Sequence, residues 1–200
     1  MKIVLATDNT GKISEFQRLL PDFNWLPQGE YSIQSPEETG LCFIENAIIK
    51  ARHAAKISGL PALADDSGII IDALDGRPGV NSARYAGDHD FAANIKKVLA
   101  ELEGISLQDR TARFCCTLAY LRSFNDPCPI VVSGFWEGII LEEPVGQNGF
   151  GYDPIFYDTE LKSSAAEISS QVKNNRSHRA KAIKSLISCL CASPELGQKS

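Results

Sequence analysis

Two adjacent carboxylates, Asp65 and Asp66, lie between a short apolar run at 63–64 and a second apolar run at 69–71. Carboxylates are strongly hydrated and depleted in strands. A pair at the junction of two β-prone segments therefore costs stability unless a metal or hydrogen-bond donors occupy the site. The pattern predicts a tight turn that carries a divalent-cation site.

A second acidic pair, Glu37 and Glu38, lies shortly before a predicted helix at about 42–58. Magnesium prefers one or two protein carboxylates together with substrate phosphates and water. Acidic turns on either side of this helix could supply those carboxylates, so the two pairs together predict a shared magnesium site. Taken alone, Glu37 and Glu38 fit solvated surface charge better than a metal site.

The segment 7–12, TDNTGK, puts hydroxyl, amide and ammonium groups between a predicted strand at 3–6 and a predicted helix. The first N–H groups of a helix and its macrodipole attract anions, so a phosphate would fit there. The segment is not a Walker loop, because the first glycine is absent and Ile13 replaces the required Ser or Thr. An ordinary helix cap is the alternative interpretation.

Two segments of the C-terminal half could bind a purine ring. The motif GFGYDP at 149–154 combines an aromatic face with a carboxylate that can accept from ring N–H groups. The motif SHR at 177–179, four residues after Lys173, places Arg and His donors at a predicted helix start, where they suit an oxygen-rich ligand. A β-turn with a core Phe and a capped surface helix are the alternatives.

The elements that must position these residues alternate along the chain, which favours an α/β fold. A Gly- and Pro-rich loop is expected at 75–90, and the last helix is expected to begin near Ser177. The further expected elements are a helix at 91–102 and strands at 111–121 and 130–136, with 139–141 a possible continuation.

Composition excludes several classes of protein. At 200 residues, with 44% hydrophobic and 22% charged residues, the chain fits one large domain or one domain with two lobes. The net charge of −5 disfavours nucleic acid and anionic membranes as partners. We expect a cytoplasmic protein with reduced cysteines, because no apolar run fits a secretory signal or a membrane span.

Seven motifs together resemble the inosine/xanthosine triphosphate pyrophosphatase family, in order and spacing, over nearly the whole chain. The resemblance implies an α/β fold in which a long, mixed, twisted sheet is flanked by helices in two lobes, with the active site in the cleft between them. It also implies a single ITPase-like domain over residues 1–200 and a homodimer. The motifs are TDNTGK at 7–12, EETG at 37–40, F-x-ENA-x-x-KA at 43–51, ADDSG at 64–68, PG-x-x-SARYAG at 78–87, GFGYDP at 149–154 and SHR at 177–179.

The resemblance assigns roles position by position. Glu38 and Asp66 match the magnesium-linked carboxylates, and Asp66 also matches the catalytic base. Ser67 matches a substrate contact, and Lys50 matches a helix lysine that faces the phosphates. The triphosphate-binding loop corresponds to Thr7, Asp8, Asn9, Thr10, Gly11 and Lys12. The nucleobase pocket corresponds to Phe150, Gly151, Tyr152 and Asp153, and the basic and base-reading residues to Lys173, His178 and Arg179.

The implied reaction is the magnesium-dependent hydrolysis of ITP, dITP and XTP to the monophosphate and pyrophosphate. Donors from Arg179 or His178 and an acceptor such as Asp153 would fit the C6 carbonyl and N1–H of hypoxanthine and xanthine. One departure from the family pattern is Asp8, where many relatives carry a small residue. We expect its carboxylate to point away from the phosphates, or to bind through water or metal. The stretch 172–176 also departs from the family's more acidic run.

Three other functions remain open at this point. A nucleotide-binding sensor would hold the ligand without cleaving it, although Glu38 and Asp66 together argue against binding alone. The septum-associated house-cleaning pyrophosphatases share the chemistry but lack the GFGYDP and SHR pair. A nucleic-acid-binding module fits least, because the chain is acidic and carries no basic aromatic stripe.

Overall fold

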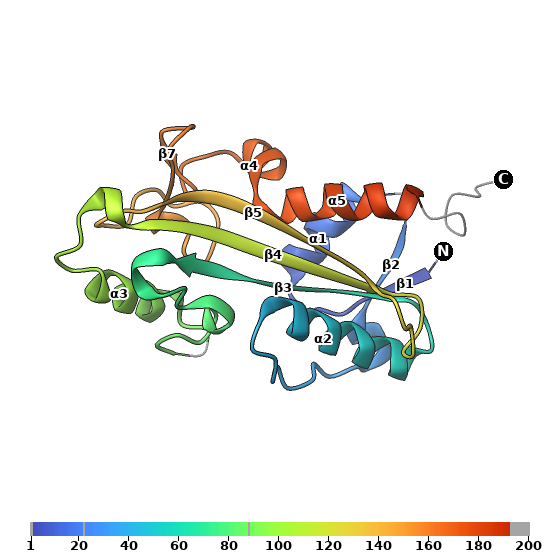
Figure 1. Ribbon diagram of the computed structural model, residues 1–200. Helices are drawn as coiled ribbons and strands as arrows, with labels where there is room; N and C mark the ends of the chain where they lie inside the picture. Colours follow the sequence, from blue (N-terminus) through green and yellow to red (C-terminus); the bar gives the residue numbers. More distant parts are fainter. Residues whose placement is uncertain (1, 22, 88, 193–200) are drawn as a thin grey trace. The chain divides into compact units, whose positions relative to one another are not determined.

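A computed structural model describes residues 2–21, 23–87 and 89–192. Helices and strands alternate around a mixed sheet, which confirms the predicted α/β class (Figure 1). Within the described residues the helices are α1 (Thr10–Leu19), α2 (Phe43–Ser58), α3 (Phe91–Glu101), α4 (Ser170–Arg176) and α5 (His178–Ala192). The strands are β1 (Lys2–Leu5), β2 (Asn24–Pro27), β3 (Ala62–Ile71), β4 (Thr111–Leu121), β5 (Ile130–Ile140), β6 (Phe156–Asp158) and β7 (Ser163–Ser164).

The strand order among the described residues is β2-β1-β3-β4-β5-β6-β7. Strand β1 pairs in parallel with both β2 and β3, whereas β6 pairs antiparallel with β5 and β7. The chain divides into two compact units. Unit 1 takes the described residues within 1–66, 116–134 and 180–200, and unit 2 takes those within 67–115 and 135–179.

Unit 1 has an apolar core on each side of its strands, because successive residues of a strand point to opposite faces. One core joins α1 and α5 to Ile3, Leu5 and Leu63. The other joins α2 to Val4, Ala62 and Ala64. Helix α2 thus covers one face of these strands, and α1 and α5 cover the other (Figure 1).

Local signals fix the ends of the unit 1 helices. The side chain of Asn9 caps α1 by accepting from the backbone N–H of Lys12 at 3.1 Å. Helix α2 starts after Cys42 and ends at Gly59, whose positive φ of 67° suits a glycine C-cap. The predicted helix at 42–58 is therefore confirmed.

Unit 2 packs around a separate apolar core. The strand residues Ile69, Ile71 and Trp136 belong to one apolar cluster that also includes Val98 of α3. The loop that precedes α3 is fixed by Asn94, which accepts from the backbone N–H groups of Ala86 and Gly87. Within the predicted long loop at 75–90, the described residues include a short 3-10 helix, Gly79–Asn81, and the loop is bonded to α3 through Asn94. The predicted helix at 91–102 is present as α3.

One prediction about the backbone is wrong. Asp65 and Asp66 do not lie in a tight turn, because β3 continues unbroken from Ala62 to Ile71. The strand tolerates two carboxylates because each one meets a lysine from a different helix, Lys12 or Lys50, so neither charge is left uncompensated.

Other elements were incompletely predicted. Strand β5 runs without interruption through 130–140, so the strand predicted at 130–136 does continue, as far as Ile140. Strand β2 and helix α4 carried no prediction, since each is short. The expected start of the last helix near Ser177 is confirmed, because α5 begins at His178.

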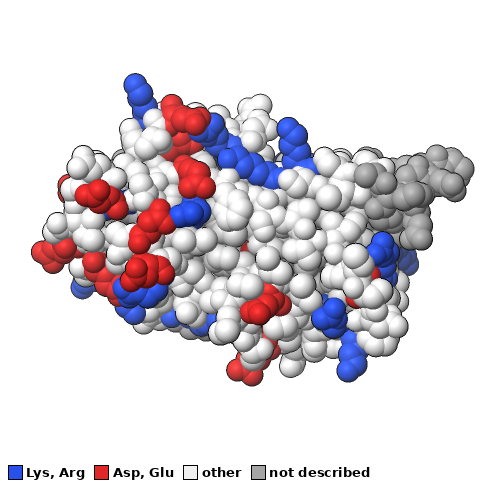
Figure 2. Space-filling model, in the orientation of Figure 1, with Lys and Arg blue, Asp and Glu red and all other residues white. Residues whose placement is uncertain are grey.

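Both kinds of charged side chain lie on the surface. On the face shown in Figure 2, the acidic side chains gather mainly at the left, and the basic ones are spread more widely. Among the described residues, no helix is both long and apolar enough to cross a membrane.

Candidate active site

The two carboxylates of β3 point to opposite faces of the strand. Asp65 lies on the face of β3 that α1 covers, where its Oδ2 forms an ion pair with the Lys12 ammonium at 2.8 Å. Asp66 lies on the face of α2, where its Oδ1 accepts from the Lys50 ammonium at 3.0 Å. The two aspartates are neighbours in sequence, but each forms a separate ion pair on its own side of the strand.

A second carboxylate shares Lys50 with Asp66. The Glu38 Oε1 accepts from the same ammonium at 2.7 Å, so the two acidic groups flank one nitrogen. Each of the two oxygens lies within a hydrogen-bond length of that nitrogen. The predicted pair Glu38 and Asp66 is thus brought together within unit 1.

Burial sets the proton affinities of this cluster. The carboxyl of Asp66 is only 7% exposed, and burial raises its pKa although Lys50 partly offsets the effect. Burial alone would lower the pKa of Lys50, but the charges of Asp66, Asp65 and Glu38 outweigh it and raise the pKa. The ammonium therefore stays charged, next to a carboxylate that is more basic than usual.

The predicted phosphate loop occupies the turn between β1 and α1. Thr10, Gly11 and Lys12 form the start of α1, and Thr7 Oγ1 accepts from the backbone N–H of Asn9 at 3.2 Å. The carboxylate of Asp8 is hydrogen-bonded: its Oδ2 accepts from Gln28 Nε2 at 2.5 Å.

One buried amide links Asp66 to the loop that carries Glu38. Asn46 Nδ2 donates to Asp66 Oδ2 at 3.2 Å, and Asn46 Oδ1 accepts from the backbone N–H of Gly40 at 2.8 Å. Asn46 was not among the predicted site residues, and Asp65, which was predicted with Asp66 to hold a cation, instead pairs with Lys12. The ENA and ADDSG motifs contained both, but their partners are visible only in three dimensions.

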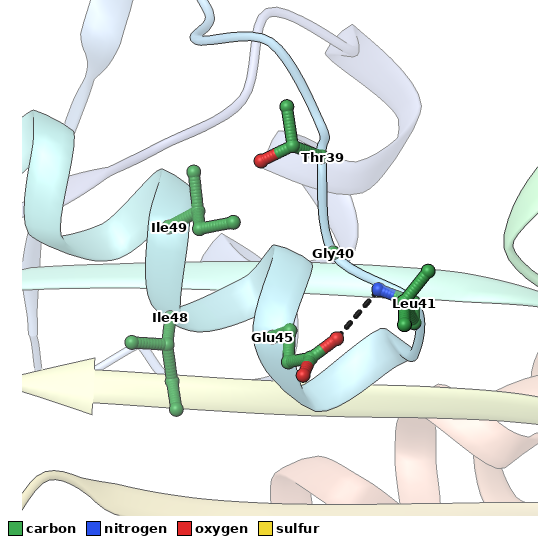
Figure 3. A pocket seen from close by; sticks show the side chains of 6 residues that line it. All are labelled: Thr39, Gly40, Leu41, Glu45, Ile48 and Ile49. Carbon is green, nitrogen blue, oxygen red and sulfur yellow. Dashed lines mark hydrogen bonds between the residues drawn. The ribbon is translucent and has the colours of Figure 1, made fainter.

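A cavity of about 390 Å³ opens beside this loop at the start of α2. Figure 3 shows Leu41, whose backbone N–H donates to the carboxylate of Glu45. The side chain of Leu41 is 91% exposed. The cavity is lined by Thr39, Gly40, Leu41, Glu45, Ile48 and Ile49.

In unit 2, Asp153 joins two of the other predicted residues. Its Oδ2 accepts from the backbone N–H of Phe150 at 2.7 Å and forms an ion pair with the Lys173 ammonium. That ammonium lies 5.1 Å from the centroid of the Phe150 ring, a cation–π distance. Burial raises the pKa of Asp153, and Lys173 offsets only part of this effect.

The other predicted residues of unit 2 are mostly buried. Tyr152 donates from its hydroxyl to the backbone carbonyl of Ser82 at 2.9 Å. His178 stacks on Phe114 with ring centroids 4.9 Å apart and planes 16° apart. Arg179 is buried next to it in sequence, Gly151 has a positive φ of 64°, and Ser67 is half-buried in β3.

The donor set of unit 1 fits magnesium. Two carboxylates from separate elements already hold one cationic group, the Lys50 ammonium, between them. Among the described residues no cluster of three or more His, Cys, Asp or Glu side chains is placed to bind a metal. A pair of carboxylates completed by phosphate oxygens is the coordination that magnesium favours.

The fold defined by this sheet and these helices is also that of solved HAM1 proteins. The HAM1 protein from Coxiella burnetii is 51% identical and matches with a TM-score of 0.92, covering 96% of this chain and 100% of that one. The Ham1 protein from Staphylococcus aureus is 41% identical, with a TM-score of 0.88 over 95% and 98% of the two chains.

The chain belongs to the Ham1 family, whose model matches residues 3–189. It is 54% identical to the dITP/XTP pyrophosphatase of Vibrio parahaemolyticus, a match that covers 96% of this chain and 97% of the relative. The resemblance inferred from the seven motifs is thereby confirmed.

Proposed function

We propose that this chain hydrolyses dITP, XTP and ITP to the monophosphate and pyrophosphate, and so removes deaminated purines from the nucleotide pool. Relatives named dITP/XTP pyrophosphatase match it at 52% and 54% identity over nearly their full length. The observation that carries the proposal is the pair of carboxylates, Glu38 and Asp66, that flank Lys50.

Asp66 acts as the general base. Its buried carboxyl has a raised pKa, which makes the ionised form a stronger proton acceptor for a water that attacks the α-phosphorus. The hydrogen bond from Asn46 and the ion pair with Lys50 hold both of its oxygens in place. A general base must be held in position before it can take a proton, and these two contacts hold Asp66 in position.

Glu38 and Asp66 would hold the magnesium ion. Magnesium, when bound, supplies positive charge that offsets the repulsion between the phosphates and an incoming nucleophile. Lys50 pairs with both carboxylates through one ammonium, which offsets part of the repulsion between the two acidic groups.

The phosphate chain would bind at the start of α1. Its first N–H groups and the ammonium of Lys12 form an anion-binding end, and Asn9 fixes the direction of the first turn. Gln28 donates a hydrogen bond to the carboxylate of Asp8 and fixes its position, and the negative charge on Asp8 remains.

The purine would be read by residues of unit 2. Phe150, 52% exposed, offers a face for stacking, and Lys173 lies near both that ring and Asp153. His178 and Arg179 supply donors for the C6 carbonyl of hypoxanthine or xanthine. Because adenine carries an amino group at that position, these donors would be left unpaired against ATP.

We also propose a homodimer that works in the cytoplasm on free nucleotides, as expected from the resemblance of the motifs and from the sequence. Residues 1–200 would then form one catalytic domain, to which both units contribute. Gel filtration with light scattering tests the dimer directly, because a monomer and a dimer of a 21.8 kDa chain differ twofold in mass.

Initial rates of pyrophosphate release test the activity. ITP and dITP should be hydrolysed at comparable kcat/KM, and XTP should also be hydrolysed. ATP should be hydrolysed about 100-fold more slowly, because a mismatched hydrogen bond strands buried polar groups. Each rate should fall to background when EDTA removes magnesium. Equal rates for all three substrates and for ATP and GTP would contradict the proposed selectivity, and release of inorganic phosphate alone would contradict the site of cleavage.

A further inference from the structure

A buried asparagine controls how the two acidic segments of unit 1 meet. Asn46 is 0% exposed and lies in the first turns of α2, between the loop of Glu38 and the strand of Asp66. It contacts Asp66 directly and reaches the Glu38 loop through the backbone of Gly40. One side chain therefore ties together the two segments that carry the proposed magnesium ligands.

The chemistry of the two contacts fixes the orientation of the amide. The backbone N–H of Gly40 can only donate, so it must meet the amide oxygen of Asn46. The amide nitrogen is then turned toward Asp66, where it donates to Oδ2. The other oxygen of Asp66 is held by Lys50. An amide of this length satisfies both contacts, and a carboxylate of the same shape cannot donate to Asp66.

The loop fits closely around this amide. A Cβ atom added at Gly40 would lie 2.6 Å from Asn46 Oδ1 and 2.6 Å from Glu45 Cβ, closer than atoms in contact can approach. Gly40 therefore permits the backbone to reach the amide. Glu38 is only two residues before Gly40, so fixing the backbone of Gly40 also limits where the Glu38 carboxylate can lie.

We propose that Asn46 is a positioning residue for the reaction, which fixes the orientation of Asp66 and its separation from Glu38. This inference rests on the proposed function, since it assigns those two carboxylates to catalysis. Asn46 would act through these two carboxylates, by its bond to Asp66 and its bond to the loop of Glu38. Its loss should slow turnover, with little effect on the binding of nucleotide.

A second asparagine provides a matched control. Asn94 is also 0% exposed and also lies in the second turn of a helix, α3. It too accepts backbone N–H groups from the loop before its helix, those of Ala86 and Gly87. Its amide nitrogen donates to the backbone carbonyl of Ala83, whereas Asn46 donates to a carboxylate. Comparing the same substitution at Asn46 and at Asn94 therefore distinguishes general structural damage from misplacement of Asp66.

The test compares Asn46→Asp with Asn94→Asp. For Asn46→Asp, kcat with dITP should fall about 100-fold, the cost typical of a misplaced catalytic group, while KM changes less than about threefold. The dissociation constant for dITP, measured by calorimetry in EDTA where no hydrolysis occurs, should also stay within about threefold of the wild-type value. Asn94→Asp should lower the melting temperature and keep kcat within about threefold.

Three outcomes overturn the inference. The first is Asn46→Asp with a kcat within threefold of wild type. The second is loss of dITP binding in EDTA by the same factor as the loss of activity, which indicates general damage. The third is an equal fall in kcat for Asn94→Asp. Failure of wild-type protein to release pyrophosphate from dITP would instead refute the proposed function.

Gly40→Ala tests the same contact from the loop side if Asn46→Asp does not fold. The added methyl group should push the loop from the amide and lower kcat at least about tenfold, with dITP binding in EDTA unchanged. A kcat equal to wild type in Gly40→Ala would overturn the inference.

Discussion

Asp66 of unit 1 and Asp158 of unit 2 are both buried aspartates, but their surroundings differ in the number of donors. Asp158, 1% exposed, accepts from Trp136, from Arg176 and from the backbone N–H groups of Glu160 and Leu161. Asp66 accepts from Lys50 and Asn46 and has a second carboxylate, Glu38, nearby.

The two pKa values move in opposite directions as a result. Burial alone would raise the pKa of Asp158, but its hydrogen bonds, led by that from Arg176, outweigh burial and lower the pKa to about 2. For Asp66 burial prevails and raises the pKa. The comparison shows that burial alone does not identify a reactive carboxylate. A carboxylate saturated with donors is structural, and one with few donors retains the proton affinity that a base needs.

The largest expected effect is a difference in activity between the asparagine variants of these two aspartates. Asp66→Asn should lower kcat for dITP by about 10²- to 10⁴-fold, because an amide cannot accept the proton of the attacking water. Asp158→Asn should keep kcat within about threefold but unfold at lower temperature. Steady-state kinetics and thermal melts of both variants measure this. Near-normal turnover in Asp66→Asn would remove the basis of the comparison.

A smaller effect should follow from removing the ammonium beside Asp66. Lys50 lowers the pKa of Asp66 against the effect of burial, so Lys50→Met should raise that pKa further. A base with a higher pKa is protonated at higher pH. The acidic limb of kcat/KM against pH should therefore shift to higher pH, with a fall in rate of about 10-fold or more at neutral pH. Lys56→Met, an exposed lysine of the same helix, is the control and should leave the profile unchanged.

The smallest effect concerns stability in acid. The folded-state pKa of Asp158, about 2, lies below its ordinary value of 3.8. Its contribution is therefore fully present above about pH 5 and is lost as the pH falls toward 2. The size is on the order of 2 kcal/mol. Urea unfolding at pH 6 and pH 3 should show a larger loss of stability for wild type than for Asp158→Asn. Equal losses in the two proteins would show that Asp158 has no lowered pKa.

Much of the framework could be predicted from the sequence. Helix α2 was placed almost to the residue, because its apolar face recurs at helical spacing and Gly59 marks its end. The start of α5 was also found, since Ser177 is a favourable residue before a helix. Short strands such as β2 carry too few residues for a periodic signal, and they form only because a neighbour pairs with them.

The site was partly predictable for the same physical reason. The composition of the ADDSG motif indicates chemistry, but the preference of carboxylates for turns led to the wrong backbone at 65–66. The lysines that compensate these charges are more than ten residues distant in the chain, so the tertiary contact that overrides the local preference has no local signal. Asn46 was missed because a buried asparagine on a helix reads as ordinary polar composition until its two contacts are known.

Successive side chains of β3 point to opposite sides of the strand, and this limits which mutations the strand tolerates. Asp65 meets Lys12 on one side of the strand, and Asp66 meets Lys50 on the other. A single codon inserted or deleted between Ala62 and Asp65 would turn each acid to the opposite side of the strand, away from the lysine that it now meets. Exchange of one apolar residue for another is compatible with this arrangement, whereas a change of length by one is not.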